Sequence, residues 1–192
     1  ITENNGRDRI LKDAELEPLL TACEGSEEPA LYPIVLMALG SGSRKGEIMN
    51  LRWNDVDLDR GVAILRDTKN NDTRSIPIQG EALEALKRYR KAQGVTPIGS
   101  AFVFSYRTGK APFDFSRAWA TAKEEAGITD LRFHDLRHTA GSKLAMAGRT
   151  MGEVGAMLGH RAAQTTKRYV HYSTDHTLDM GNDLAISRKP RK

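Results

Sequence analysis

The longest apolar run of the chain, from Leu31 to Gly40, limits how the chain can fold. It falls well short of the ~18 residues that cross a bilayer, so we interpret it as a helix of the core. A helix that is hydrophobic on all sides has to be buried among other elements. Pro29 suits the first turn of this helix, which we predict over residues 29–39.

Further helices and one hairpin are predicted around this segment. Helical patterns cover residues 13–23, 44–51, 81–92, 112–126, 135–147, 150–158, 164–171 and 174–186. Residues 62–65 and 75–78 read as two strands joined by a polar loop, and Pro77 is typical of an edge strand. Residues 102–104 predict one more short buried strand. The pattern indicates an α+β fold that is mainly α-helical.

Charge and cysteine content narrow the class of protein. The net charge of +4 and the pI near 9.2 fit a nucleic-acid partner without proving one. The single cysteine, Cys23, excludes an internal disulfide framework and fits a reducing cytosol. The N-terminus lacks the basic, apolar and small-residue order of a secretory signal. The chain begins with Ile1 rather than Met, which hints at a fragment of a longer protein.

Arginine, histidine and tyrosine residues that could carry chemistry occur close together in the last third of the sequence. Arg137 follows His134 by nearly one helical turn, so the two side chains can converge. Gly159 is a natural C-cap, His160 follows it, and Tyr169 comes nine residues later. Arginine grips phosphate oxygens, histidine moves protons near neutral pH, and tyrosine can act as a nucleophile. These residue types suit a phosphate as the reacting group.

Two more cations lie in the N-terminal half. Residues 40–43, with the sequence Gly-Ser-Gly-Ser, predict a tight turn, and Arg44 follows at a helix N-terminus. An arginine there is unfavourable for the helix dipole but suits an anion site, where backbone N–H groups also point. A solvated surface arginine is the alternative. Lys69, at the shoulder of the predicted hairpin, is either a mobile cation for the same site or a solvated surface lysine.

A zinc site and a P-loop are alternative interpretations of these motifs. His134 and His138 have the spacing of a zinc-protease motif, but that motif requires Glu where this chain has Asp135. Arg137 would also place a cation beside the metal. A P-loop requires Gly-Lys-Ser/Thr, whereas residues 45–47 read Lys-Gly-Glu. Local capping or hydrogen bonding remains the structural explanation for any one histidine.

Taken in order, these residues resemble the catalytic domain of the tyrosine recombinases, the phage integrase family. The resemblance runs over residues 12–185 and implies that family's catalytic fold, with a small antiparallel β-sheet on one side. Each motif alone is weak, but together, in order and at family-like spacing, they are specific. Four segments carry it: Ser41-Gly42-Ser43-Arg44-Lys45-Gly46-Glu47-Ile48, Thr68-Lys69, His134-Asp135-Leu136-Arg137-His138-Thr139, and Leu158-Gly159-His160 followed by Tyr169-Val170-His171.

The resemblance implies roles for the matching cations. Arg44 and Arg137 correspond to the two arginines that clamp the scissile phosphate. Lys69 corresponds to the hairpin lysine that protonates the leaving 5′ oxygen. Glu47 matches an acidic position that supports the first arginine from behind, and His138 matches a position one layer behind the site.

The proton-transfer groups and the nucleophile follow from the same resemblance. His134 and His160 correspond to the histidines that assist proton transfer and brace the phosphate. Tyr169 corresponds to the nucleophile, whose attack gives a 3′-phosphotyrosine link and a free 5′-hydroxyl. Tyr172 lies nearby, but the Tyr-x-His pattern and the spacing from His160 favour Tyr169.

The implied function is site-specific recombination of double-stranded DNA by strand cleavage and rejoining, as in an integrase. It implies no metal and no cofactor, because arginines, a lysine and histidines cover the charges. Exchange between two duplexes implies a homotetramer on DNA. Accessory DNA-bending proteins fit as further partners. The expected location is the bacterial cytoplasm, at the nucleoid when the protein is bound to DNA. A DNA-binding protein with a vestigial site and a topoisomerase IB-like relaxing enzyme are the alternatives.

The resemblance also divides the chain. We expect residues 1–11 to be a linker or lead-in from a missing N-terminal DNA-binding domain. Residues 12–186 would form the catalytic domain, and residues 187–192 a basic tail.

Overall fold

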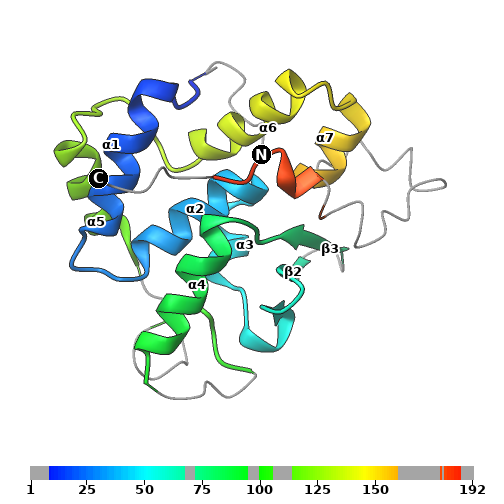
Figure 1. The fold of residues 1–192 in the computed structure, drawn as a ribbon, viewed down its shortest axis with the longest axis horizontal. Coiled ribbons are helices and arrows are strands. Elements are labelled where there is room, and N and C mark those ends of the chain that lie inside the picture. Colours follow the sequence, from blue (N-terminus) through cyan, green and yellow to red (C-terminus); the bar gives the residue numbers. More distant parts are fainter. Residues whose placement is uncertain are drawn as a thin grey trace.

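The computed structural model describes residues 9–67, 72–94, 100–105, 114–159, 178 and 180–186. Helices dominate this part of the chain, and a small sheet lies at one side of it (Figure 1). The helices are α1 (Asp13–Glu24), α2 (Leu31–Ser41), α3 (Lys45–Met49), α4 (Glu81–Ala92), α5 (Ser116–Glu125), α6 (Asp135–Met146) and α7 (Met151–Leu158). A 3₁₀ turn, η1 (Trp53–Asp55), precedes the strands β1 (Val56–Asp57), β2 (Val62–Asp67) and β3 (Asp72–Pro77).

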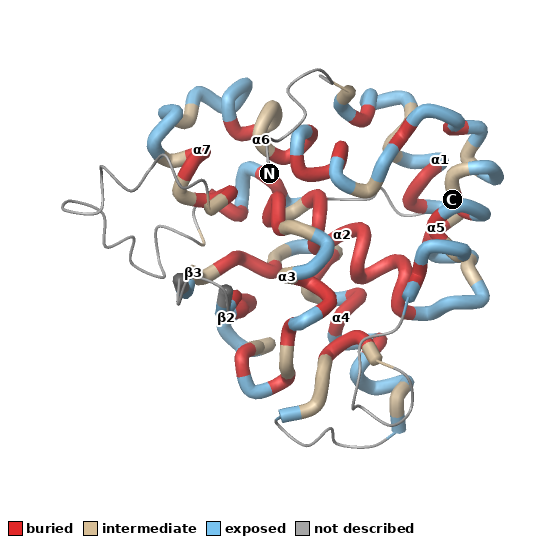
Figure 2. The backbone as a smooth tube through the Cα atoms, turned by 180° about the vertical axis from the view of Figure 1, so that it is seen from behind, coloured by how far each residue is buried: buried red, intermediate tan, exposed pale blue. Residues whose placement is uncertain are grey.

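Helix α2 is the centre of the fold. All its residues except Gly40 are buried, and it packs against α1, α4 and α6. Figure 2 shows it as a buried segment that crosses the middle of the molecule. The helix begins at Leu31, two residues later than predicted, so Pro33 rather than Pro29 lies in its first turn. Proline fits there because the first N–H groups of a helix have no partner within the helix.

The sheet is antiparallel, with strand order β1-β2-β3. Ala63 pairs with Ile76 and both are fully buried, whereas Ile64 between the inward positions is 37% exposed. One face of the sheet therefore covers the core, as the alternation along a strand requires. Within the described residues β3 is an edge strand, which confirms the interpretation of Pro77. Of the short strand predicted at residues 102–104, only Phe102 forms a β-bridge, with Arg52.

Two apolar cores hold the helices together. The larger is built from α1 to α5, the sheet and Leu136 of α6. The smaller joins α6 and α7 to the C-terminal segment: Ala140, Leu144, Val154, Met157, Leu158, Met180 and Leu184. In Figure 1 this red C-terminal segment lies between α7 and β3. A Cβ at Gly181 would lie 2.3 Å from Pro77 Cβ, so only glycine allows this close approach to the sheet.

The chain ahead of α1 is attached to the same body. The Leu11 N–H donates to Thr139 Oγ1 at 2.8 Å, and Arg9 Nη2 lies 2.6 Å from Glu15 Oε1. Cys23 is buried in the larger core, and burial raises the pKa of its thiol to about 12. Residues 164–171, which were predicted as helical, lie outside the described residues, as do residues 174–177 and 179 of the helix predicted at 174–186. Residues 178 and 180–182 of that last segment are helical.

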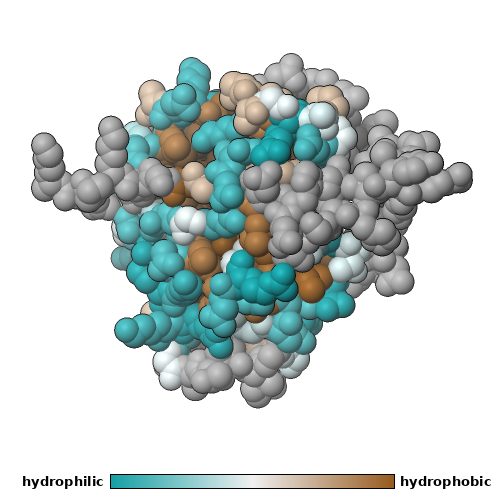
Figure 3. All heavy atoms as spheres, turned by 45° about the vertical axis from the view of Figure 1, so that its right-hand side comes forward, coloured by the Kyte–Doolittle hydropathy of each residue, from teal (hydrophilic) through white to brown (hydrophobic). Residues whose placement is uncertain are grey.

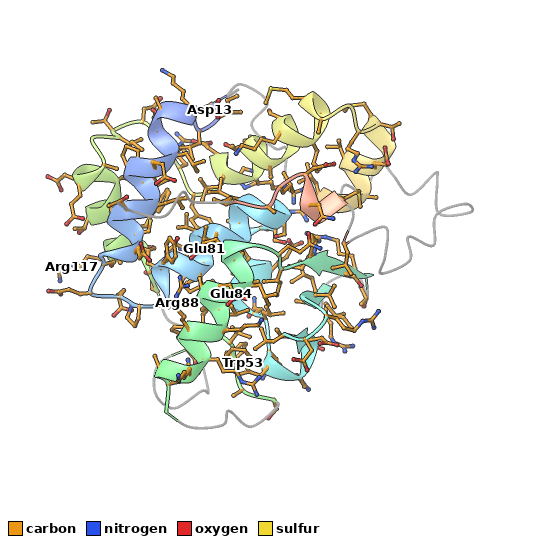
Figure 4. All side chains as sticks on the ribbon, viewed as in Figure 1. Asp13, Trp53, Glu81, Glu84, Arg88 and Arg117 are labelled. Carbon is orange, nitrogen blue, oxygen red and sulfur yellow. The ribbon has the colours of Figure 1, made fainter. Side chains whose placement is uncertain are left out.

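Hydrophilic residues cover most of the described surface on the face drawn in Figure 3. Figure 4 shows Glu81, Glu84 and Arg88 along α4, with Trp53 beside the same helix. Arg88 Nη2 lies 2.7 Å from Glu81 Oε1, and the guanidinium of Arg90 lies 5.3 Å from the centre of the Trp53 ring. No helix among the described residues has the length and apolarity that crossing a membrane requires.

Candidate active site

The turn between α2 and α3 fixes the position of Arg44. Gly42 adopts a left-handed conformation with φ of 63°, which ends α2. Ser41 Oγ donates to Met37 O at 2.7 Å and lies 2.8 Å from Ser43 Oγ, and both serines are buried. The turn is thus stabilised from inside, and Arg44 follows it as the residue that caps α3.

Glu47 holds Arg44 at both its backbone and its side chain. The Arg44 N–H donates to Glu47 Oε2 at 2.7 Å, and Arg44 Nη1 donates to Glu47 Oε1 at 3.1 Å. Glu47 thus occupies the Arg44 N–H, at the start of this helix. The Arg44 side chain, which is 40% exposed, adds its positive charge there.

A second arginine, Arg74 of β3, binds the Glu47 carboxylate through two hydrogen bonds. Arg74 Nη1 and Nη2 each donate to one oxygen of the Glu47 carboxylate at 2.8 Å. Burial works to raise the pKa of Glu47, but the hydrogen bonds and charge of Arg74, with the Arg44 N–H, outweigh it and lower the pKa to about 2. Glu47 is therefore ionised at any physiological pH, and this cluster of two arginines and one carboxylate keeps a net positive charge.

Arg74 belongs to none of the motifs recognised in the sequence. The strand alternation contains a signal for it, because Arg74 shares a face with Ile76, which is fully buried, and pairs in register with Leu65. A cation at an inward-facing position of a strand needs a buried partner. That signal says a partner exists but does not identify Glu47.

Arg137 lies beneath the turn that carries Arg44. It comes from α6, its exposed fraction is 4%, and its Nη1 donates to Gly42 O at 2.8 Å and to Leu158 O at 2.6 Å. Gly42 lies two residues before Arg44, and Leu158 is the last residue of α7. Arg137 thereby ties together the two segments that carry the first and last motifs of the described part.

The end of α7 closes the arrangement. Gly159 ends the helix with φ of 69°, as the sequence predicted. A Cβ at Gly159 would lie 2.6 Å from Arg74 Nη1. Contacts therefore run in a closed circuit from Arg44 through Glu47, Arg74 and the end of α7 to Arg137, and back to Gly42.

The two histidines of the α6 motif lie at its N-terminal end. His134 caps the helix, and its ring and that of His138 meet edge to face with centres 5.0 Å apart. Both are exposed, on the helix that places Arg137 inwards. Among the residues that the structure describes, no three His, Cys, Asp or Glu side chains come together as a metal site.

Three of the predicted site residues, Lys69, His160 and Tyr169, lie outside the described residues. The structure brings Arg44, Glu47 and Arg137 together, and it adds Arg74 to them. His134 lies on the same helix as Arg137, just before its first turn.

Comparisons with known proteins agree on one family. The family described as the phage integrase family matches residues 9–176. A shufflon-specific DNA recombinase of Escherichia coli is 37% identical over 169 residues. The alignment covers 88% of this chain and 41% of the relative, so the chain spans less than half the length of that curated relative.

Solved structures share the fold. The catalytic domain of bacteriophage HP1 integrase matches with a TM-score of 0.62 and 25% identity, over 87% of this chain and 89% of that one. The integrase of the Tn1549 transposon, solved in complex with circular intermediate DNA, matches with a TM-score of 0.65 and 25% identity, over 96% of this chain and 70% of that one. The expected fold class, a mainly helical domain with a small antiparallel sheet, is confirmed.

Proposed function

Because the chain belongs to the phage integrase family, we propose that it is the catalytic domain of a tyrosine-type site-specific DNA recombinase. Tyr169 attacks the scissile phosphodiester, forms a 3′-phosphotyrosine link and releases a 5′-hydroxyl. The reverse attack by a 5′-hydroxyl of the partner strand rejoins the DNA. The observation that carries the proposal is the bond from Arg137 Nη1 to the Gly42 carbonyl, which joins two motifs that lie far apart in the sequence.

The two arginines supply what the reaction needs most. The phosphodiester is already anionic, and its transition state places more charge on the non-bridging oxygens. Guanidinium groups that are held in place before the reaction stabilise that charge without reorganising. Arg137 is held by backbone carbonyls and Arg44 by a carboxylate that Arg74 shares, so both are preorganised in this way.

The remaining steps are proton transfers. A tyrosine has a pKa of about 10, so nearby cations and a histidine that accepts its proton would both help it attack. His134 and His160 are the histidines we assign to this step. The leaving 5′ oxygen is a strong base, and we assign its protonation to Lys69. General acid catalysis of this kind contributes ~10²–10⁴ in rate.

The partners we propose are double-stranded DNA and three further copies of the protein, because strand exchange joins two duplexes with one nucleophile at each of four cleavage points. The support for DNA is the basic site itself and the Tn1549 integrase, whose structure was solved with DNA. Accessory DNA-bending proteins and a place in the bacterial cytoplasm belong to the same proposal.

A covalent adduct tests the proposal directly. The protein, expressed from its complete reading frame, is incubated with sheared genomic DNA of its source, denatured and digested with nuclease. We expect mass spectrometry to find a nucleotide on Tyr169, and sequencing of the attached strands to give the target site. The Tyr169→Phe variant is the matched control, since it removes one oxygen and should bind the same DNA without an adduct.

Three results would contradict the proposal. A nucleotide on Tyr172 in place of Tyr169 would move the nucleophile. Tight DNA binding without any adduct, even on nicked duplexes that trap the cleaved strand, would favour a vestigial site. Relaxation of supercoiled plasmid by single protomers, with no exchange between two duplexes, would favour the topoisomerase-like alternative.

A further inference from the structure

We propose that Arg74 is a positioning residue for the cleavage step, which holds Glu47 against Arg44 and at the same time supports the turn at Gly159 that leads to His160. The proposal rests on the proposed function, because it assigns Arg74 its role through Arg44. No motif that identified the family includes Arg74.

The first contact fixes Glu47. Both terminal nitrogens of Arg74 bond to the two carboxylate oxygens at 2.8 Å, which sets the plane of the carboxylate as well as its position. The pair is largely shielded, with exposed fractions of 20% for Arg74 and 14% for Glu47. Glu47 in turn accepts hydrogen bonds from the Arg44 N–H and from Nη1, so the direction of Arg44 depends on the carboxylate that Arg74 holds.

The charge balance also depends on Arg74. A carboxylate paired with Arg44 alone would neutralise the group that is meant to stabilise a phosphate. Arg74 supplies a second positive charge, and the pair formed by Arg44 and Glu47 through one side-chain nitrogen is longer, at 3.1 Å. The carboxylate therefore orients Arg44 while most of its charge is taken up by Arg74.

The second contact reaches the end of α7. A Cβ at Gly159 would lie 2.6 Å from Nη1 and 3.0 Å from Cζ of Arg74, so the guanidinium lies directly against the glycine backbone. Any side chain at this position would push Arg74 away from Glu47. Arg137 holds the preceding carbonyl, that of Leu158. The segment that continues into His160 thus starts from a turn held by two arginines.

Arg74 acts through its neighbours and not on the phosphate. A guanidinium can bind phosphate oxygens through its Nη1–Nη2 edge or through its Nε edge. In Arg74 the Nη1–Nη2 edge is committed to Glu47, and Nε is buried, so neither edge is open to a phosphate. Arg66 on the neighbouring strand offers a contrast, because it pairs with Asp55 at 2.7 Å but is 62% exposed. Arg66→Gln therefore breaks an arginine–carboxylate pair of the same sheet that lacks the contacts to Glu47 and Gly159.

The first test needs no DNA. The pKa of Glu47 is followed by carbon-13 NMR of the carboxyl in the wild type and in Arg74→Gln, Arg74→Lys and Arg66→Gln. We expect Arg74→Gln to raise this pKa from about 2 toward its ordinary value of 4.5, Arg74→Lys to raise it less, and Arg66→Gln to leave it unchanged. Thermal unfolding of each variant shows that the comparison is made on folded protein.

The second test measures cleavage. The probe is a nicked duplex of the sequence recovered from the wild-type Tyr169 adduct, made once with the natural phosphodiester and once with a neutral methylphosphonate at the scissile position. Misplacing a group that stabilises the transition state by about 1 Å costs on the order of 10²-fold in rate. We expect Arg74→Gln to lose about that much on the phosphodiester and much less on the methylphosphonate, where Arg44 has less charge to offset.

The outcomes separate the two proposals. A general folding defect would slow both probes by the same factor, and that result overturns the role of Arg74, as does an unchanged cleavage rate or an unchanged pKa of Glu47. If the wild type cleaves and only the Arg74 prediction fails, the proposed function stands. If the wild type itself forms no adduct on Tyr169, the proposed function fails and the role of Arg74 in cleavage fails with it.

Discussion

Arg44 and Arg137 are both held in a fixed position, but by different kinds of partner. Arg137 is 4% exposed and is held by the carbonyls of Gly42 and Leu158. Arg44 is 40% exposed and is held by a carboxylate whose pKa is lowered to about 2. Arg137 therefore also connects backbone segments of the fold, whereas Arg44 is oriented by a neighbouring side chain and, within the described residues, connects none of them. If both arginines act as proposed, Arg137 serves the fold as well as the reaction, whereas Arg44 serves the reaction alone.

The largest effect is expected from Arg137→Ala. It removes transition-state stabilisation, where loss of one donor costs about 10²–10³ in rate, and it also leaves two carbonyls without this donor, at about 1–3 kcal/mol each when buried. Arg44→Ala should show the same loss of adduct formation but a stability close to the wild type, because Arg74 still holds Glu47. Urea unfolding and the rate of Tyr169 adduct formation measure both. Equal stability of the two variants would remove the contrast.

Gly42→Ala tests the turn that lies just before Arg44 and whose Gly42 carbonyl accepts a hydrogen bond from Arg137. A Cβ there would lie 2.3 Å from Leu158 Cδ2 at a φ of 63°, so overpacking of about 1–3 kcal/mol adds to the strain of a left-handed conformation. Gly148→Ala is the matched control, since Gly148 has φ of 81° but open space around it, and only the strain of ~1–2 kcal/mol applies. Urea unfolding should rank Gly42→Ala as the more destabilised. Equal losses would mean that Leu158 yields without cost.

Low pH should weaken the hydrogen bonds and ion pairs that Glu47 makes with Arg44 and Arg74, because it protonates the Glu47 carboxylate. Its pKa is lowered from 4.5 to about 2 in the folded protein, so its contribution is complete above pH 4.5 and is lost as the pH falls toward 2. That shift corresponds to about 3 kcal/mol. The stability difference between the wild type and Glu47→Gln should shrink by this amount over that interval, as measured by urea unfolding at a series of pH values. A difference that stays constant would show that Glu47 does not titrate there.

The smallest effect is expected from Arg66→Gln. Arg66 of β2 forms an ion pair with Asp55 of η1, but the Arg66 side chain is 62% exposed, and water screens such a pair so that it contributes little. Adduct formation should equal that of the wild type. A loss of activity comparable to that of Arg74→Gln would show that the whole hairpin, and not Arg74 alone, positions the site.

Local patterns predicted much of this fold. The limits of α4 and the glycine that ends α7 were predicted correctly, because helical periodicity and a C-cap glycine depend on neighbours within a few residues. The sequence was wrong about the proline in the first turn of α2, because the start of a helix with no capping side chain leaves a weak signal. The sequence did not show that Glu47 folds back and accepts from the Arg44 N–H at the start of α3.

The sequence by itself determined the residue types of the site, their order and the family to which the chain belongs. Only the tertiary structure decided which groups hold them: Arg137 reaches a carbonyl 95 residues away, and Arg74 a carboxylate 27 residues away. The physical reason is that a residue's spacing fixes its face on a helix or strand, whereas the partner on that face depends on how separate elements pack. Arg74 looks like an ordinary strand residue until β3 lies against α3 and the end of α7.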